Sequence, residues 1–147
     1  MNLILASVRS QGEIALAVAT SGIAATLLDG GRTAHSTFKL PLNLATNEMP
    51  ICNIGKNTKE AQLLKYAKIA LIDECSMLHK KGLEAINRLM QDLKDSKSLF
   101  GGLTFVLAGD FRQCLPVIAG GNSADQLKAC LKSSQLWDHV KVFICLS

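Results

Sequence analysis

Short apolar runs recur along this chain, and each is followed by a segment with the pattern of an amphipathic helix. Three of these runs are residues 14–19, 68–72 and 103–107. A run that is apolar at nearly every position predicts a parallel strand covered on both faces, because a strand with one exposed face alternates between polar and apolar residues. The alternation of such runs with helices predicts an α/β fold in which helices cover both faces of a parallel sheet.

Periodicity and capping residues predict the remaining elements. Helices are expected at 1–11, 23–28, 58–66, 80–94 and 123–131, a short ordered segment at 35–40, a polar surface excursion at 43–57, and a final strand at 140–146. In the first helix Leu3, Ile4 and Val8 are expected to share the buried face. In the helix at 80–94 the apolar residues at helical spacing are Leu83, Ile86, Met90 and Leu93.

The composition excludes several classes of protein. With 147 residues, 48% of them hydrophobic and 19% charged, the chain is long enough to bury a core and too apolar to be disordered. Its net charge of +4 permits a polyanionic partner without requiring one. The longest apolar stretches are too short to span a bilayer, so we expect no membrane partner.

The cysteines favour a reducing compartment. They are five in number and include no CxxC pair: Cys52, Cys75, Cys114, Cys130 and Cys145. An odd set without metal-ligand spacing argues against both a disulfide framework and a zinc site. Cys75 and Cys114 adjoin polar residues of interest, but we interpret each as a small semi-buried side chain and not as a nucleophile.

Polar residues follow three of the predicted strands, where function collects in parallel sheets. Asp73 and Glu74 end the strand at 68–72, and two adjacent carboxylates there suit a Mg²⁺ site and a general base for water. The alternative is an exposed turn in which Ser76 caps the next helix. In the loop after 103–107, which begins with Gly109 and Asp110, Gln113 could hydrogen-bond a terminal phosphate or its attacking water, and Arg112 could pair with phosphate. The alternative is an ordinary polar loop.

Two further segments offer groups that suit nucleic-acid phosphates and bases. The candidate residues are Thr20, Ser21, Gly22, His35, Ser36 and Phe38. Their small hydroxyls and backbone N–H groups could bind phosphates, and Phe38 or His35 could stack on a base. The alternative is that Ser21 caps a helix and Phe38 belongs to the core.

Three motifs in order carry a family resemblance. The segments ATSGIAATLLDGGRTAHSTFKLP, LIDECSM and GDFRQCLPV closely resemble the petite-integration-frequency (PIF-type) DNA helicases, most of all the branch associated with Helitron mobile elements. The resemblance implies a RecA-like P-loop NTPase fold. It also implies an ATP-driven superfamily 1 motor that uses Mg²⁺, moves 5′ to 3′ on single-stranded DNA and works in the nucleus.

The resemblance also implies roles for individual residues. By position, Asp73 matches the Mg²⁺-linked aspartate of helicase motif II, and Glu74 matches its catalytic glutamate. Gln113 matches the glutamine of motif III that senses the γ-phosphate, with Asp110 and Arg112 beside it. The DNA-contacting elements of the family, motif Ia and the element after it, correspond to Thr20–Gly22 and to His35, Ser36 and Phe38.

One motif of the family is missing from these 147 residues, because no GxxxxGK[ST] phosphate loop occurs in them. We therefore expect residues 1–147 to be part of a first motor domain, cut at both ends, without the phosphate-loop strand and the second motor domain. Such a chain is expected to be inactive alone and to have a split sheet or open edges that invite pairing.

Two other interpretations remain open from the residues. One is a non-enzymatic remnant or nucleic-acid-binding module from a decayed mobile-element gene. The other is an unrelated doubly wound hydrolase or binding domain that uses Asp73 and Glu74 differently. The sequence leaves the oligomeric state undetermined.

Overall fold

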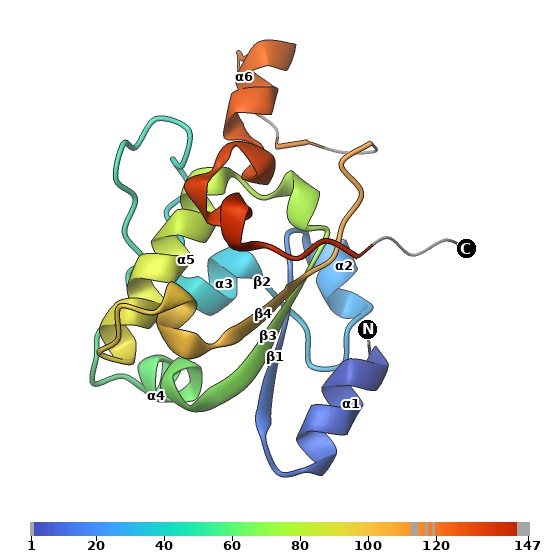
Figure 1. Cartoon of the computed structure of the whole chain (residues 1–147), viewed down its shortest axis with the longest axis vertical. Coiled ribbons are helices and arrows are strands. Elements are labelled where there is room, and N and C mark those ends of the chain that lie inside the picture. The colour runs from blue at the N-terminus through green and yellow to red at the C-terminus, as the bar shows by residue number, and fades with distance from the viewer. Residues whose placement is uncertain (1, 113–114, 117, 119, 144–147) are drawn as a thin grey trace.

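The computed structural model describes residues 2–112, 115–116, 118 and 120–143, in which helices cover both faces of a parallel sheet (Figure 1). The strands are β1 (Ile14–Ala19), β2 (Arg32–Thr33), β3 (Ala67–Asp73) and β4 (Thr104–Leu107). Their order across the sheet is β2-β1-β3-β4, and each neighbouring pair is parallel. The predicted α/β class is therefore confirmed, and the carboxyl ends of the strands share one edge of the sheet.

Helices connect the strands and follow the last of them. They are α1 (Asn2–Ser10), α2 (Gly22–Thr26), α3 (Ala34–Phe38), α4 (Lys59–Tyr66), α5 (Lys80–Leu93) and α6 (Ser123–Ala129), with 3₁₀ turns η1 (Cys75–Met77), η2 (Leu99–Gly102), η3 (Leu131–Ser133) and η4 (Gln135–His139). Side-chain caps set several of their starts. The hydroxyl of Thr58 accepts a hydrogen bond from the backbone N–H of Ala61, and Asn122 forms a capping box with Asp125.

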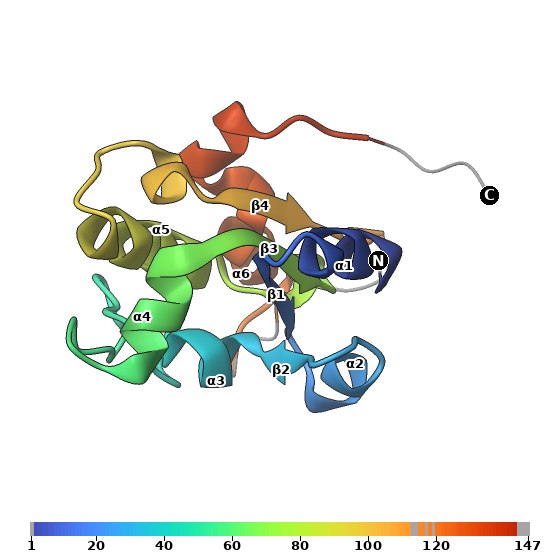
Figure 2. The same ribbon diagram turned by 90° about the horizontal axis from the view of Figure 1, so that it is seen from below.

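The sheet separates two apolar layers (Figure 2). On one face α1 and α2 pack against the alanines of β1, whose small side chains let the helices approach closely. On the other face α3, α4 and α5 pack against larger residues of β1 and β3. The expected stripe of α5 is confirmed, because these four residues are buried: Leu83, Ile86, Met90 and Leu93.

Two expectations about the ends are wrong. The buried face of α1 contains Leu5, which is 0% exposed, and Val8 packs beside it as predicted, whereas Leu3 is 82% and Ile4 42% exposed. The helix is therefore rotated relative to the prediction. Residues 140–143 form no strand, and Phe143 is 86% exposed. A strand needs a hydrogen-bonding neighbour, and none lies beside this segment among the described residues; 144–146 lie outside them.

The sheet is not split in the described part of the chain. Its two edge strands are β2 and β4. The polar surface segment at 43–57 contains no helix or strand, as predicted. Arg88 and Lys81 tie it to α5 through hydrogen bonds to the carbonyl oxygens of Pro50 and Asn47. None of the described helices has the length and apolar character needed to cross a membrane.

Candidate functional site

The ends of β1 and β3 are joined at the carboxyl edge of the sheet. In the parallel register Ala19 lies opposite Asp73, so the residues that follow the two strands meet. The backbone N–H of Thr20 donates to the carbonyl oxygen of Asp73 at 3.3 Å, and the Thr20 hydroxyl donates to the carbonyl oxygen of Glu74 at 3.0 Å. The convergence predicted for these two strand ends is confirmed.

The backbone turns sharply at the acidic pair. Glu74 has φ 54° and ψ 40°, a left-handed conformation that costs a residue with a side chain about 1–2 kcal/mol. The Asp73 carboxylate stabilises the turn, because its Oδ1 accepts a hydrogen bond from the Glu74 N–H at 2.8 Å. Strain of this kind persists at functional sites, where the surrounding contacts hold it.

Ser21 connects this turn to the start of α2. Its Oγ accepts a hydrogen bond from the backbone N–H of Ala24 at 3.2 Å, which makes Ser21 the N-cap that the sequence predicted. The same hydroxyl donates to Oε2 of Glu74 at 3.3 Å. One side chain therefore joins a candidate DNA-contacting segment to the candidate general base.

The carboxyl end of β4 lies beside those of β1 and β3. The N–H of Ala108 donates to the carbonyl oxygen of Ile72 at 2.9 Å, and the N–H of Cys75 donates to the carbonyl oxygen of Ala108 at 2.8 Å. Gly109 then passes so close to η1 that an added Cβ would lie 3.0 Å from the backbone nitrogen of Ser76. Only glycine fits this approach without movement, and the sequence interpretation overlooked its role.

The alternative interpretation of Asp73 and Glu74 as an exposed turn is wrong. Ser76 is buried and does not cap α5. The N-cap of α5 is His79, whose Nδ1 accepts a hydrogen bond from the backbone N–H of Lys81 at 3.1 Å. The acidic pair thus belongs to a tightly constrained junction of three strand ends.

Asp110 and Arg112 form a pair with each other. Two guanidinium nitrogens of Arg112 donate to the Asp110 carboxylate, at 3.1 and 3.2 Å, and these hydrogen bonds hold the pKa of Asp110 below its ordinary value. The Arg112 side chain is 89% exposed. Two nitrogens of its guanidinium group therefore bind Asp110, and the phosphate contact expected for Arg112 stays a prediction. Gln113 lies outside the described residues.

The two candidate DNA-contacting segments lie side by side. The pairing of β1 with β2 places Ala19 opposite Thr33, so α2 and α3 begin next to each other. The hydroxyl of Ser36 accepts a hydrogen bond from Arg32 at 2.7 Å. His35 is half-buried. Gly22, in contrast, is exposed at the first position of α2.

The stacking prediction for Phe38 is wrong. Its side chain is 0% exposed, and its ring lies 6.4 Å from that of Phe105, measured between centroids. An aromatic ring that already packs in the core cannot also stack on a base. Phe38 instead anchors α3 beneath the half-buried polar residues, as the alternative interpretation held.

The described cysteines are packed inside the protein. Cys52, Cys75 and Cys130 are free and buried. Burial raises the pKa of the Cys75 thiol to about 12, and the neighbouring Asp73 carboxylate contributes to the rise. A thiol of this kind is not a nucleophile at neutral pH, which supports the interpretation of Cys75 as a packed side chain. Cys114 lies outside the described residues.

Comparisons with known proteins agree with this geometry. The family model described as PIF1-like helicase matches residues 1–147. The chain belongs to the PIF1-like helicase family. It is 33% identical over 127 residues to the ATP-dependent DNA helicase Pif1 of a Psychrobacter species, a match that covers 86% of this chain and 19% of the relative. It is 29% identical to the helicase RRM3 of Saccharomyces cerevisiae, covering 90% of this chain and 18% of the relative.

Solved structures of PIF1-like helicases have the same fold. The Pif1 helicase of Candida albicans has a TM-score of 0.76 at 26% identity, covering 93% of this chain and 30% of that one. A Bacteroides Pif1 bound to single-stranded DNA has a TM-score of 0.63 at 27% identity, covering 83% and 28%. The fold is therefore RecA-like. The chain spans about a fifth of the length of these two curated relatives.

Proposed function

We propose that these residues form the hydrolytic part of the first motor domain of an ATP-dependent DNA helicase that moves 5′ to 3′ on single-stranded DNA. The observation that carries the proposal is the shared hydroxyl of Ser21. It caps the start of α2 and donates to the Glu74 carboxylate. A displacement of α2 by DNA would therefore move the group that activates water.

Asp73 and Glu74 have different environments, which suits different roles. The peptide N–H that binds Oδ1 of Asp73 orients this carboxylate and leaves its second oxygen for a metal. In the described part of the chain no three histidine, cysteine, aspartate or glutamate side chains are placed so that they could hold a metal ion together. Mg²⁺ fits such a site, because it commonly takes one or two carboxylates together with phosphate oxygens and water. Bound there with ATP, Mg²⁺ would neutralise charge on the transferred phosphoryl group.

Glu74 is proposed as the general base. Its left-handed backbone turns the side chain toward Ser21, and the hydrogen bond at 3.3 Å holds one carboxylate oxygen. The other oxygen is then positioned to accept a proton from the attacking water. Gln113 is proposed to bind the γ-phosphate or this water, with Asp110 and Arg112 next to it.

On the DNA side we assign Thr20, Ser21, Gly22, His35 and Ser36 to contacts with the phosphate backbone. These residues lie at one edge, because β1 and β2 end side by side. One of the two structures cited above is of a relative bound to single-stranded DNA. Another solved structure is that of a Bacteroides Pif1 helicase in complex with ADP-AlF3 and single-stranded DNA.

We further propose that residues 1–147 do not hydrolyse ATP alone. They contain no GxxxxGK[ST] segment, and without its backbone N–H groups and lysine nothing holds the β- and γ-phosphates. The purified chain should therefore show no Mg²⁺-dependent ATP turnover, with or without oligothymidine. Turnover that survives repurification and disappears in Glu74→Gln would refute this part of the proposal.

A chimera tests the assignment of residues. These residues would replace the aligned 127-residue stretch of the Psychrobacter helicase, which supplies the rest of the motor. We expect DNA-stimulated ATPase activity in the chimera and a loss of about 100-fold or more in kcat with Glu74→Gln, the range of general-base catalysis. Glu13→Gln, an exposed change before β1 at the opposite edge, is the matched control. Equal activities of the two variants would exclude Glu74 as the base.

A further inference from the structure

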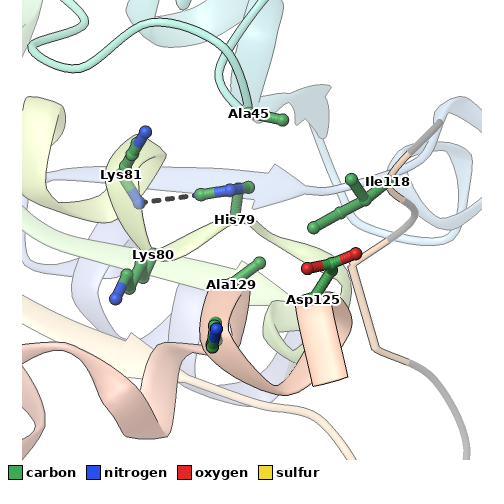
Figure 3. Close-up of a pocket in the computed structure, with 8 residues that line it drawn as sticks. Ala45, His79, Lys80, Lys81, Ile118, Asp125 and Ala129 are labelled. Atoms are coloured by element: carbon green, nitrogen blue, oxygen red, sulfur yellow. Dashed lines mark hydrogen bonds between the residues drawn. The ribbon is translucent and has the colours of Figure 1, made fainter. Parts of the chain in front are cut away.

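A basic pocket lies beside the junction described above, between the start of α5 and α6. Its volume is about 310 Å³. The described residues that line it are Ala45, His79, Lys80, Lys81, Ile118, Asp125, Lys128 and Ala129. Figure 3 shows His79 between Lys81 and the side chains of Asp125 and Ile118. The pocket thus combines side chains from three separate parts of the chain.

The charge of its lining is positive. The lining contains three lysines, Lys80, Lys81 and Lys128, and one carboxylate, that of Asp125. That carboxylate already accepts a hydrogen bond from the backbone N–H of Asn122 at 3.0 Å, within the capping box of α6. Among the described residues the ion pairs are Lys56 with Asp92 and Arg112 with Asp110, so the three lysines are not paired with carboxylates.

The lysines differ in how free they are. Lys81 is held in place, because its Nζ donates to the carbonyl oxygen of Asn47 at 3.1 Å. Lys128 is exposed and Lys80 is half-buried. Burial and the two neighbouring ammonium groups lower the pKa of His79, which stays neutral at pH 7. Since Nδ1 of His79 accepts the hydrogen bond that caps α5, its Nε2 carries the proton and can donate.

The remaining lining limits what the pocket can recognise. Ala45, Ile118 and Ala129 add no ring and no acceptor to the lining. The one ring, that of His79, and the one carboxylate, that of Asp125, are already engaged in the caps of α5 and α6. Donors and positive charge without a further ring or acceptor suit the phosphate backbone of a nucleic acid, read independently of sequence. His79 follows Glu74 by only the turn η1, so a strand that contacts the carboxyl edge of the sheet can reach the pocket.

We propose that this pocket binds a backbone phosphate of single-stranded DNA, with Lys80 and Lys128 as its mobile cations and Lys81 and His79 as its fixed frame. The inference rests on the proposed function, because it extends the DNA path from α2 and α3 across the edge to α5 and α6. It adds an anchoring contact that does not depend on the residues of motif Ia.

The salt dependence of DNA binding tests the proposal. The full 147-residue chain, Lys80→Gln/Lys128→Gln, and the control Lys65→Gln/Lys94→Gln would be titrated with fluorescein-labelled oligothymidine between 50 and 200 mM NaCl. The control removes equal charge from the ends of α4 and α5 that lie away from the pocket. Each phosphate contact adds about 0.7 to the slope of log affinity against log salt. Because the pocket is proposed to hold one phosphate, the pocket variant should lose about 0.7 in slope and bind roughly tenfold more weakly at 50 mM NaCl.

Each outcome decides between the alternatives. If the wild type binds and the pocket variant equals the control, the pocket inference is wrong and the proposed function stands. If the wild type does not bind, the proposed DNA contacts fail together with the pocket. A parallel calorimetric titration with tripolyphosphate identifies the phosphate source. Tighter binding of tripolyphosphate than of oligothymidine, lost in the pocket variant, would show a site for free polyphosphate and overturn the assignment to DNA.

Discussion

Replacing Gly109 by alanine should loosen the junction between β4 and the acidic turn. A Cβ on Gly109 would lie 3.0 Å from the nitrogen of Ser76 and 3.1 Å from both the nitrogen and the Sγ of Cys75. Relaxed contacts to a carbon atom are about 3.5–4.0 Å, so the two segments must separate by about half an ångström. That movement strains the hydrogen bond from Cys75 N–H to the Ala108 carbonyl oxygen, now 2.8 Å.

The expected loss of stability follows from these contacts. Overpacking of one methyl group costs about 1–3 kcal/mol, and a weakened buried hydrogen bond costs about 1 kcal/mol. We expect the free energy of unfolding to fall by about 2 kcal/mol. Urea unfolding, followed by the fluorescence of Trp137, would then show a midpoint lower by about 1 M with an unchanged m-value. Trp137 is the only tryptophan, and its ring packs edge-on against Phe111.

A glycine elsewhere serves as the control. At Gly55 an added Cβ would meet only the methyl group of Thr58, at 3.4 Å, so Gly55→Ala should change stability by no more than about 0.5 kcal/mol. If Gly109→Ala were as stable as Gly55→Ala, the close approach of β4 to η1 would not hold in solution. The argument that glycine is required there would then be refuted.

Two further predictions concern Ser21 and His79. Ser21→Ala removes an N-cap and a hydrogen bond to a carboxylate, so it should lower the free energy of unfolding by about 1–2 kcal/mol. Ser21→Asp keeps the cap but places a second carboxylate beside Glu74. In the chimera it should therefore reduce ATPase activity more than Ser21→Ala does. His79 lies among Lys80 and Lys81 of α5 and Asp125 and Lys128 of α6. Burial lowers its pKa in the folded chain, so the unfolded chain binds more protons. The free energy of unfolding should therefore fall as the pH drops below about 6.5. His79→Asn should keep the cap and flatten this fall, which cannot exceed about 1.4 kcal/mol per pH unit for one proton; an unchanged pH profile would exclude His79 as its source.

The local pattern was sufficient for most of the elements. The runs 14–19 and 69–72 are apolar throughout, which is typical of strands buried on both faces in a sheet connected by helices. Capping hydroxyls were recognisable for the same reason, since Ser21 and Thr58 precede helices and their hydrogen bonds are local. The strand predicted at 140–146 is absent from the described residues 140–143, because strand formation depends on a neighbour that these residues do not themselves specify.

The sequence by itself determined which groups lie at the carboxyl ends of the strands, because parallel strands end at one edge whatever surrounds them. Only the tertiary structure decided how these groups are used. It buries Phe38 against Phe105, pairs Arg112 with Asp110, and brings Ser21 within hydrogen-bond distance of Glu74. These relations join residues far apart in the chain or depend on backbone turns, and packing and hydrogen-bond geometry set both after the strands have aligned.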